Sequence, residues 1–346
     1  MKKWLRNPWL WAGVLVVAAL AIYPLYRQIF APNVTTPDGE SAEFFVHTGW
    51  DYTRVGDQLL QQKLIKDPMA FHWVARQMNY PRNVKPGRYI LQHNMSTRDL
   101  VQLLRSGKQT PVKFTFVKFR TTQQLADYVA EKLEMRPAEL LEALNDRAFL
   151  EKFNGLTPQT ALAIFIPNTY EVYWNIKPKD LVSRMYKEYQ AFWTQDRNNL
   201  REKLGLSRLE VVTIASIVEE ESNQNEEKPR IAGVYLNRIK KGWPLEADPT
   251  VKYAVGDFSL RRILDVHLQT DSPYNTYMYP GIPPGPICTP SIPSIDAVLN
   301  RERHDYMFFC AKVEGDGYHH FSQTLAEHSA YAQQYHSMLN QRGIMQ

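Results

Sequence analysis

An uninterrupted apolar segment is the first pattern along the chain. No charged side chain occurs between Pro8 and Tyr26. At about 1.5 Å per helical residue, this segment is long enough to cross a hydrocarbon core of roughly 30 Å. Basic residues precede it and aromatic residues mark both ends, at Lys2, Lys3, Trp4, Arg6, Trp9, Trp11, Tyr23 and Tyr26. These flanks are typical of a membrane span, so residues 1–30 are predicted to be a cytoplasmic N-terminus and a transmembrane helix.

A cleaved signal peptide is the alternative for this segment, with Ala19-Leu20-Ala21 as the small-residue site. The apolar run continues past that site, which favours the anchor. In both interpretations the rest of the chain is exported from the cytoplasm.

The next residues alternate between polar breaks and short periodic segments. Residues 31–42 are polar and contain Pro and Gly, which predicts a linker. Residues 43–110 then predict a small α+β module in the order strand, helix, helix, strand, with a further helix. The expected elements are a strand at 43–47, a helix at 53–62, a helix from Pro68 capped by Asp67, a strand at 87–91, and a helix from Ser96 or Thr97 to 106–107.

Residues 111–346 predict a larger mixed α+β domain, so the fold class is α+β. Alternation at 114–119 indicates a strand, and amphipathic patterns indicate helices at 121–134, 137–152 and 180–203. A compact turn is expected at 166–171, and a buried helix from about Ser207. Residues 243–325 are rich in Pro, Gly, Tyr and Asn, which predicts short strands joined by loops.

Composition narrows the function classes. The chain has 346 residues, enough for an anchor and about two domains, and a net charge of +5. Because no basic cluster follows the N-terminus, a nucleic-acid partner is not expected. His319 and His320 are adjacent, and the spacing of Cys288 and Cys310 matches no metal motif. We therefore expect no metal and no cofactor.

The main chemical candidate is an acidic run that closes an apolar helix. Residues 211–218 are apolar around most of the helix axis, which indicates burial, and Glu219, Glu220 and Glu221 follow. Glu219 and Glu221 continue apolar faces, where burial would raise a carboxyl pKa and suit a general acid. The alternative is that the three glutamates only end the helix and face water, although carboxylates at a helix C-terminus interact unfavourably with the helix dipole. The pattern alone does not separate Glu219 from Glu221.

Aromatic and amide side chains on Pro-stiffened loops form a second candidate. The segments are Tyr274-Asn275-Thr276-Tyr277 and residues 282–287. Aromatic rings stack on sugar faces and amides form hydrogen bonds with sugar hydroxyls, so these loops are typical of a glycan-binding surface. The alternative is a Pro-rich loop in which the tyrosines only pack against the protein. Asp248-Pro249-Thr250 is a third candidate, with a turn or helix cap as the alternative.

Several segments together resemble the YceG-like endolytic murein transglycosylases. The segment 215–221 resembles the family signature, and further matches occur in the family's order. They are Pro167-Asn168-Thr169-Tyr170, Tyr235-Leu236-Asn237-Arg238, Asp248-Pro249-Thr250, Tyr274-Asn275-Thr276-Tyr277, Pro283-Pro284-Gly285-Pro286-Ile287 and His320-Phe321. The resemblance covers nearly the whole chain, including the anchor and a LysM-like module at 43–110.

The resemblance implies a single-pass inner-membrane enzyme that cleaves nascent peptidoglycan strands internally, between N-acetylmuramic acid and N-acetylglucosamine, with a 1,6-anhydro product. It implies a role in cell-wall assembly beside wall synthases. Carried over, the essential acid is Glu221. Supporting or substrate-binding candidates are Glu219, Ser216, Asn237, Asp248, Thr250, Tyr274, Asn275 and Tyr277. Two positions depart from the family pattern, because Glu220 replaces a basic residue and Cys288 replaces a small one.

Two other functions and one covalent link stay open. A glycoside hydrolase on the same scaffold would add water to the product, and a non-catalytic protein would only bind glycan through its LysM-like module. A disulfide between Cys288 and Cys310 is permitted in an exported protein, although Cys310 lies in an apolar run, where an unpaired cysteine is often simply a small buried hydrophobic residue.

Overall fold

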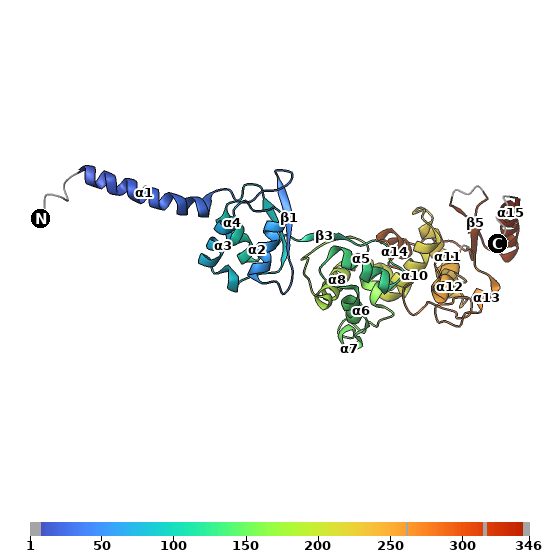
Figure 1. The fold of residues 1–346 in the computed structure, drawn as a ribbon. Coiled ribbons are helices and arrows are strands. Elements are labelled where there is room, and N and C mark those ends of the chain that lie inside the picture. The colour runs from blue at the N-terminus through green and yellow to red at the C-terminus, as the bar shows by residue number, and fades with distance from the viewer. Residues whose placement is uncertain (1–7, 261, 314–316, 342–346) are drawn as a thin grey trace. The chain divides into compact units, whose positions relative to one another are not determined.

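The structure is a computed structural model that describes residues 8–260, 262–313 and 317–341. These residues form two compact units (Figure 1). Unit 1 lies within Met1–Lys113, Lys132–Glu134 and Glu171–Ile176, and unit 2 within Phe114–Glu131, Met135–Tyr170 and Lys177–Gln346. Both helices and strands are present, as the α+β prediction requires.

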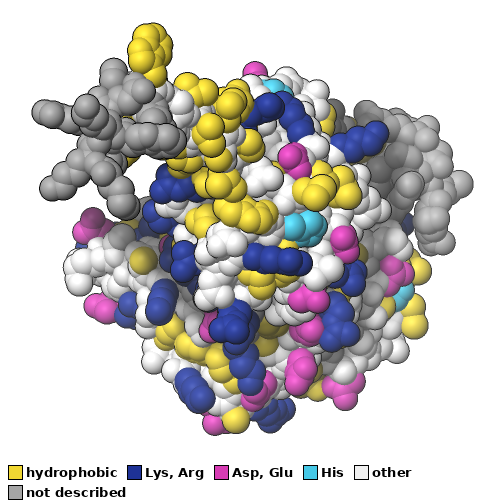
Figure 2. Space-filling model, turned by 60° about the vertical axis from the view of Figure 1, so that its left-hand side comes forward, with side chains coloured by type: hydrophobic (Ala, Val, Ile, Leu, Met, Phe, Trp, Pro, Cys, Tyr) yellow, Lys and Arg dark blue, Asp and Glu magenta, His cyan; other side chains and the backbone are white. Residues whose placement is uncertain are grey.

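The apolar N-terminal segment forms one helix, α1 (Pro8–Phe30). Its part from Trp11 to Phe30 is long and apolar enough to cross a membrane, and its side chains are exposed, including Val17 and Leu20. Hydrophobic side chains gather accordingly at the upper left of Figure 2. The helix passes through 19–21 without a break. The expected flanking residues Lys2, Lys3, Trp4 and Arg6 lie outside the described residues.

The module that follows α1 has the predicted order of elements. They are β1 (Ser41–Val46), α2 (Tyr52–Gln61), α3 (Pro68–Gln77), the 3-10 helix η2 (Tyr80–Arg82), β2 (Gly87–Gln92) and α4 (Thr97–Ser106). β1 and β2 pair antiparallel, from Ser41 opposite Gln92 to Val46 opposite Gly87. Asp67 and Ser96 cap α3 and α4 as expected, because each side chain accepts a backbone N–H of the first turn.

The segment expected to be a linker is partly folded against this module. Pro32 and Val34 form bridges with Ser96 and Ile65. The buried side chain of Asn33 accepts the backbone N–H of Asp67 at 2.6 Å and donates to its carbonyl at 2.9 Å. Val34 joins the apolar core between the sheet and helices α2 to α4. Hydrogen bonding of this backbone therefore fixes the end of α1 to the module.

Unit 2 is mainly helical. Its elements, with two strands that reach into unit 1, are β3 (Val112–Thr115), α5 (Thr122–Lys132), α6 (Pro137–Asn145), α7 (Arg147–Leu150), η3 (Ala161–Ile164), β4 (Thr169–Val172), α8 (Pro178–Phe192), α9 (Gln195–Leu204), α10 (Arg208–Glu221), α11 (Lys228–Lys240), α12 (Asp248–Val255), α13 (Asp265–Leu268), α14 (Ile292–Leu299), β5 (Phe308–Ala311), β6 (His319–Ser322) and α15 (Leu325–Gln341). β3 pairs with β4, and β5 pairs antiparallel with β6.

Several sequence predictions in this unit need correction. The strand expected at 114–119 ends at Thr115, and part of the turn expected at 166–171 is strand β4. The helix expected at 180–203 is two helices, because Thr194 caps α9 by accepting the N–H of Arg197. The described part of residues 243–325 contains the three short helices α12, α13 and α14 besides the β5–β6 hairpin. Pro249 and Pro293 stand in the first turns of α12 and α14, where proline starts a helix instead of breaking it.

The centre of unit 2 is α10, which packs against α11, α12 and α14. Ser207 and Glu210 form the capping box that starts it. Residues 211–218 are all buried, as the apolar pattern predicted. The acidic end of α10 is therefore held inside a ring of packed helices.

Candidate active site

The three glutamates at the end of α10 have different surroundings. Glu220 contacts two cations, with its Oε2 at 2.7 Å from Arg120 Nη2 and its Oε1 at 3.1 Å from Lys118 Nζ. Burial alone would raise the pKa of Glu220, but the hydrogen bond from Arg120 and the charge of Lys118 outweigh burial and lower it. Glu220 is therefore an ionised, paired carboxylate.

Glu219 is tied into the packing of three helices. Its Oε2 accepts hydrogen bonds from Ser291 and Ser294 Oγ, each at 2.5 Å, and from Lys228 Nζ at 3.1 Å. Burial opposes ionisation, but the two hydroxyl bonds and Lys228 lower the pKa of this carboxyl. Lys228 is itself buried, so Glu219 compensates an interior cation. The contacts indicate a structural carboxylate.

Glu221 contacts a neutral partner instead of a cation. Tyr235 on α11 donates its phenolic hydrogen to Glu221 Oε1 at 2.5 Å. Burial raises the pKa of Glu221 to about 7, and the negative charge of Asp248 adds to the rise, while the Tyr235 hydrogen bond opposes it. Of the three glutamates, Glu221 is the one suited to give and take a proton near neutral pH.

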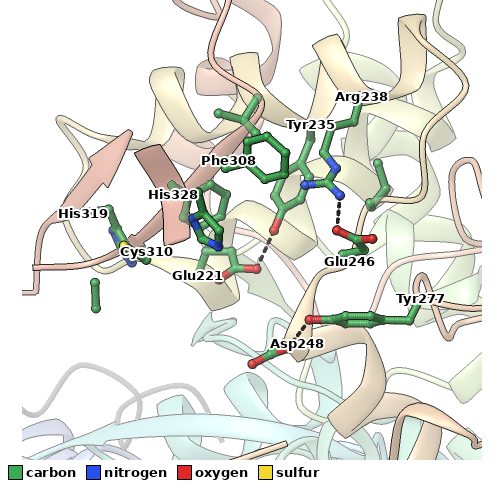
Figure 3. Close-up of a pocket in the computed structure, with 14 residues that line it drawn as sticks. Glu221, Tyr235, Arg238, Glu246, Asp248, Tyr277, Phe308, Cys310, His319 and His328 are labelled. Carbon is green, nitrogen blue, oxygen red and sulfur yellow. Dashed lines mark hydrogen bonds and ion pairs between the residues drawn. The ribbon is translucent and has the colours of Figure 1, made fainter. Parts of the chain in front are cut away.

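A cavity of about 320 Å³ opens at Glu221. Figure 3 shows Asp248 and Tyr277 on one side of it and His319 and Cys310 on the other. Its lining combines ionisable and aromatic side chains from α10, α11, α12, the β5–β6 hairpin and α15. The lining residues are Glu221, Val234, Tyr235, Arg238, Leu245, Glu246, Asp248, Tyr277, Phe308, Phe309, Cys310, Ala311, His319 and His328.

Two hydrogen-bonded pairs organise this lining. Tyr277 donates to Asp248 Oδ1 at 2.7 Å, and burial together with that carboxylate raises the pKa of Tyr277. Arg238 forms an ion pair with Glu246 and donates to the Met307 carbonyl at 3.1 Å. The cavity thus holds a protonatable carboxyl beside fixed charges, an arrangement found at acid–base sites.

Of the residues expected at the site, Glu221, Asp248 and Tyr277 meet at this cavity. The others lie around it and hold its loops. Ser216 Oγ accepts the Ile287 N–H at 3.0 Å, Thr250 is 2.8 Å from Thr276 between their hydroxyls, and Asn237 donates to the His304 carbonyl at 2.8 Å. None of these three lines the cavity.

Asn275 and Tyr274 are also outside the cavity lining. The Asn275 amide donates to the carbonyls of Leu268 and Thr270 at 2.8 and 2.9 Å, and its Oδ1 accepts the Tyr277 N–H at 3.1 Å. With all of these groups bonded inside the protein, Asn275 positions the loop of Tyr277. The ring of Tyr274 packs on Tyr253, with centroids 4.7 Å apart.

The two cysteines are free, so the possible disulfide does not form. Cys288 is buried against α10, where its thiol donates to the Ser216 carbonyl at 3.4 Å. Cys310 lies on β5 in the cavity wall. The two thiols lie in different places, because the Pro-rich loop that carries Cys288 packs on α10 and not on the β5–β6 hairpin that carries Cys310.

Several cavity residues have no role that the sequence patterns predict. Tyr235 and Arg238 occur in a segment that matches the family, while Glu246 and His328 belong to none of the motifs. Tyr235 and Arg238 are three residues apart on α11, a spacing that places both on one helix face. From that spacing the sequence predicts that Tyr235 and Arg238 share a face of α11. It does not predict which face of α11 lies against Glu221.

Comparison with known proteins gives concordant results. The YceG-like family model matches residues 44–334. The endolytic murein transglycosylase of Bacillus subtilis (strain 168) is 27% identical over 333 residues, covering 92% of this chain and 91% of that protein. The endolytic murein transglycosylase of Streptococcus pneumoniae serotype 2 (strain D39) is 28% identical over 315 residues, covering 81% of this chain and 57% of that protein.

A solved structure agrees with these matches. The crystal structure of a YceG-like protein from Listeria monocytogenes superposes with a TM-score of 0.56 at 28% sequence identity. The alignment covers 84% of this chain and 99% of that chain.

Proposed function

This chain belongs to the YceG-like family, and from that premise we propose that it is a lytic transglycosylase that cuts peptidoglycan glycan strands at internal bonds. The observation that carries the proposal is Glu221, a carboxyl at a cavity whose pKa is raised to about 7 by burial. Its neighbours Glu219 and Glu220 contact cations, which leaves Glu221 as the proton donor.

The proposed reaction needs one acid–base group. Protonated Glu221 donates its proton to the glycosidic oxygen between N-acetylmuramic acid and N-acetylglucosamine. The bond from C1 of N-acetylmuramic acid to that oxygen breaks and leaves an oxocarbenium-like centre at C1. The Glu221 carboxylate then takes the proton of the same sugar's C6 hydroxyl as O6 bonds to C1. A 1,6-anhydro ring forms, Glu221 regains its proton and no water is consumed.

Neighbouring residues assist this carboxyl. A hydrolase would need a second carboxylate to activate water or attack the sugar. Asp248, held by Tyr277, instead stabilises the positive charge that develops on the sugar. Tyr235 orients Glu221 through the 2.5 Å hydrogen bond and stabilises its ionised form. Glu219, Ser216, Asn237, Thr250, Tyr274 and Asn275 act by holding α10 and the loops in place.

The proposal extends to the setting of the enzyme. The apolar helix α1 anchors it in the inner membrane by a single pass, with both units on the outer side. Residues 43–110 form a LysM-like module that binds glycan, and residues 111–346 form the catalytic domain. The substrate is the nascent strand, the partners are wall synthases, and the biological outcome is termination of glycan strands.

Product analysis tests the proposal. Purified peptidoglycan is digested with the protein, and the fragments are identified by mass spectrometry. Internal cuts that end in 1,6-anhydro-N-acetylmuramic acid are expected. Reducing ends that carry the mass of one added water would replace the transglycosylase by a hydrolase. Glycan that is bound but left uncut would indicate a binding protein.

A further inference from the structure

The basic residues of the module are unevenly distributed. Residues 31–62 contain one Lys or Arg and five Asp or Glu, whereas residues 63–108 contain nine Lys or Arg and two Asp. The second segment supplies α3 and α4, and these are the module helices that pack against α1. The basic half of the module is therefore the half next to the apolar helix.

The junction between α1 and the module holds this half in a fixed position. Asn33 is hydrogen-bonded to the backbone of Asp67, and Thr35 N–H bonds to the Leu64 carbonyl at 3.0 Å. The guanidinium of Arg98 lies over the Phe30 ring, 5.7 Å from its centroid. Because α1 continues to Phe30 without a flexible connection, the starts of α3 and α4 stay beside its last turn.

A hollow of about 470 Å³ lies at this junction, lined in part by Arg27, Lys66 and Thr97. Exposed apolar side chains are nearby, since Phe30 is 44% exposed and Met69, in the first turn of α3, is 78% exposed. Figure 2 brings the side that carries α1 forward and shows Lys and Arg side chains on it beside hydrophobic ones. Basic heads with apolar neighbours suit a bilayer interface, where long cations reach headgroups and apolar side chains reach acyl chains.

We propose that Arg27, Lys66, Arg98, Phe30 and Met69 form a docking surface for the outer face of an anionic phospholipid bilayer. The inference rests on the proposed membrane span of α1 and goes beyond anchoring. Cations close to an anionic leaflet bind its headgroups, and the effect fades within a Debye length of the surface. Docking holds the module at the membrane, where strands still attached to the bilayer begin.

A spin label at Met69→Cys tests this surface in the full chain, with Cys288 and Cys310 replaced by alanine. The chain is placed in vesicles of phosphatidylcholine alone or mixed with phosphatidylglycerol. Collision of the label with oxygen, which concentrates in lipid, is compared with collision with a water-soluble nickel chelate. We expect lipid-like contact in the anionic vesicles and water-like contact in pure phosphatidylcholine or at high salt. A label at Ser106→Cys, at the other end of α4, should stay in water throughout.

Charge reversal provides the matched comparison. Lys66→Glu with Arg98→Glu should lower the ratio of lipid to water collisions at position 69 by at least about fivefold. Lys85→Glu with Lys108→Glu makes the same charge change near the end of α4, where a Cβ on Gly107 would lie 3.3 Å from Lys85 Cγ, and should leave the ratio unchanged. A label at 69 as water-exposed as the label at 106 in anionic vesicles would overturn the proposal. Equal effects of the two charge pairs would also overturn it.

Two further readouts separate this inference from the proposed function. Release of the chain from vesicles by alkaline extraction would refute both the anchor and the docking surface. Cleavage of soluble glycan strands by the unlabelled wild-type chain in the same vesicles reports on the Glu221 cavity alone. An intact label response with no cleavage would refute the transglycosylase and leave the docking surface standing.

Discussion

The core of unit 1 and the cavity of unit 2 are interiors of opposite kinds. The first is built from apolar side chains such as Phe44, Phe71 and Leu100, which are removed from water. The second encloses Glu221, a phenol and the Arg238–Glu246 pair. Apolar burial stabilises the fold in proportion to area, whereas a charge held away from water opposes folding unless it is paired. The core of unit 1 therefore stabilises the fold, whereas the cavity of unit 2 holds ionisable groups whose burial lowers the stability.

The end of α10 shows the same contrast within one turn. Glu219 and Glu220 satisfy the rule for buried charges because cations contact them. Glu221 does not, and its pKa is raised to about 7 as a result. We infer that the apolar burial of residues 211–218 offsets the cost of one poorly compensated carboxyl.

Glu221→Gln should reduce cleavage by roughly 10²- to 10⁴-fold, because amide nitrogen cannot replace an acidic proton. The size and the hydrogen-bonding capacity of the side chain are kept, so the fold should persist. Rates of 1,6-anhydro product formation measure the effect. Glu226→Gln, at an exposed position five residues further on, is the control. Near-normal cleavage by Glu221→Gln would place the acid elsewhere.

Glu219→Gln should act mainly on stability. It leaves the buried cation Lys228 without its carboxylate, a loss of about 3–5 kcal/mol in the free energy of unfolding. Cleavage, measured below the unfolding transition, should fall much less than in Glu221→Gln. Urea unfolding supplies the free energy. A stable but inactive Glu219→Gln protein would indicate that Glu219 is the catalytic acid and that Glu221 is the structural carboxylate.

Leu100→Ala tests the apolar side of the comparison. The side chain is fully buried in unit 1, so its loss should destabilise that unit by about 2–5 kcal/mol. The pH dependence of cleavage should not change, because the cavity lies in unit 2. Gln102→Ala, exposed on the same helix, should have little effect. A shifted pH profile in Leu100→Ala would show that the two interiors are coupled.

The raised pKa of Glu221 predicts a pH-dependent stability. Its pKa is about 7 in the folded protein and 4.5 for an ordinary glutamate carboxyl, so the native state binds the proton more tightly. The contribution is fully present below pH 4.5 and is lost as the pH rises through 7, on the order of 3 kcal/mol. Unfolding free energies of wild type and Glu221→Gln, compared between pH 5 and 8, should diverge in this way. Parallel curves would contradict the raised pKa.

Tyr235→Phe should give the smallest change, a displacement of the pH–rate profile. The phenol stabilises ionised Glu221, so its removal should raise the pKa of Glu221 further above 7. Because the acid must be protonated, activity should then persist to higher pH than in wild type. Tyr274→Phe, outside the cavity lining, is the control. A displacement toward lower pH would show that Tyr235 does not donate to this carboxyl.

Local sequence signals predicted much of the fold. Asp67 and Ser96 identified the starts of α3 and α4, and the apolar run 211–218 identified a buried α10. These features depend on residues that are neighbours in the chain. The sequence does not predict the short helices after residue 243, because proline usually indicates loops, although at Pro249 and Pro293 it lies in the first turn of a helix.

The sequence alone predicted an apolar N-terminal helix, the order of elements in the module, the resemblance to the YceG-like family and the acidic end of a buried helix. It did not determine which of the neighbouring carboxyls stays without a cation. That distinction comes from the folded arrangement, because Arg120 lies just before α5 while Lys228 and Tyr235 lie on α11, and folding brings both segments to α10. A carboxyl's pKa depends on the charges and solvent around it in space, and those surroundings exist only when distant segments have packed together.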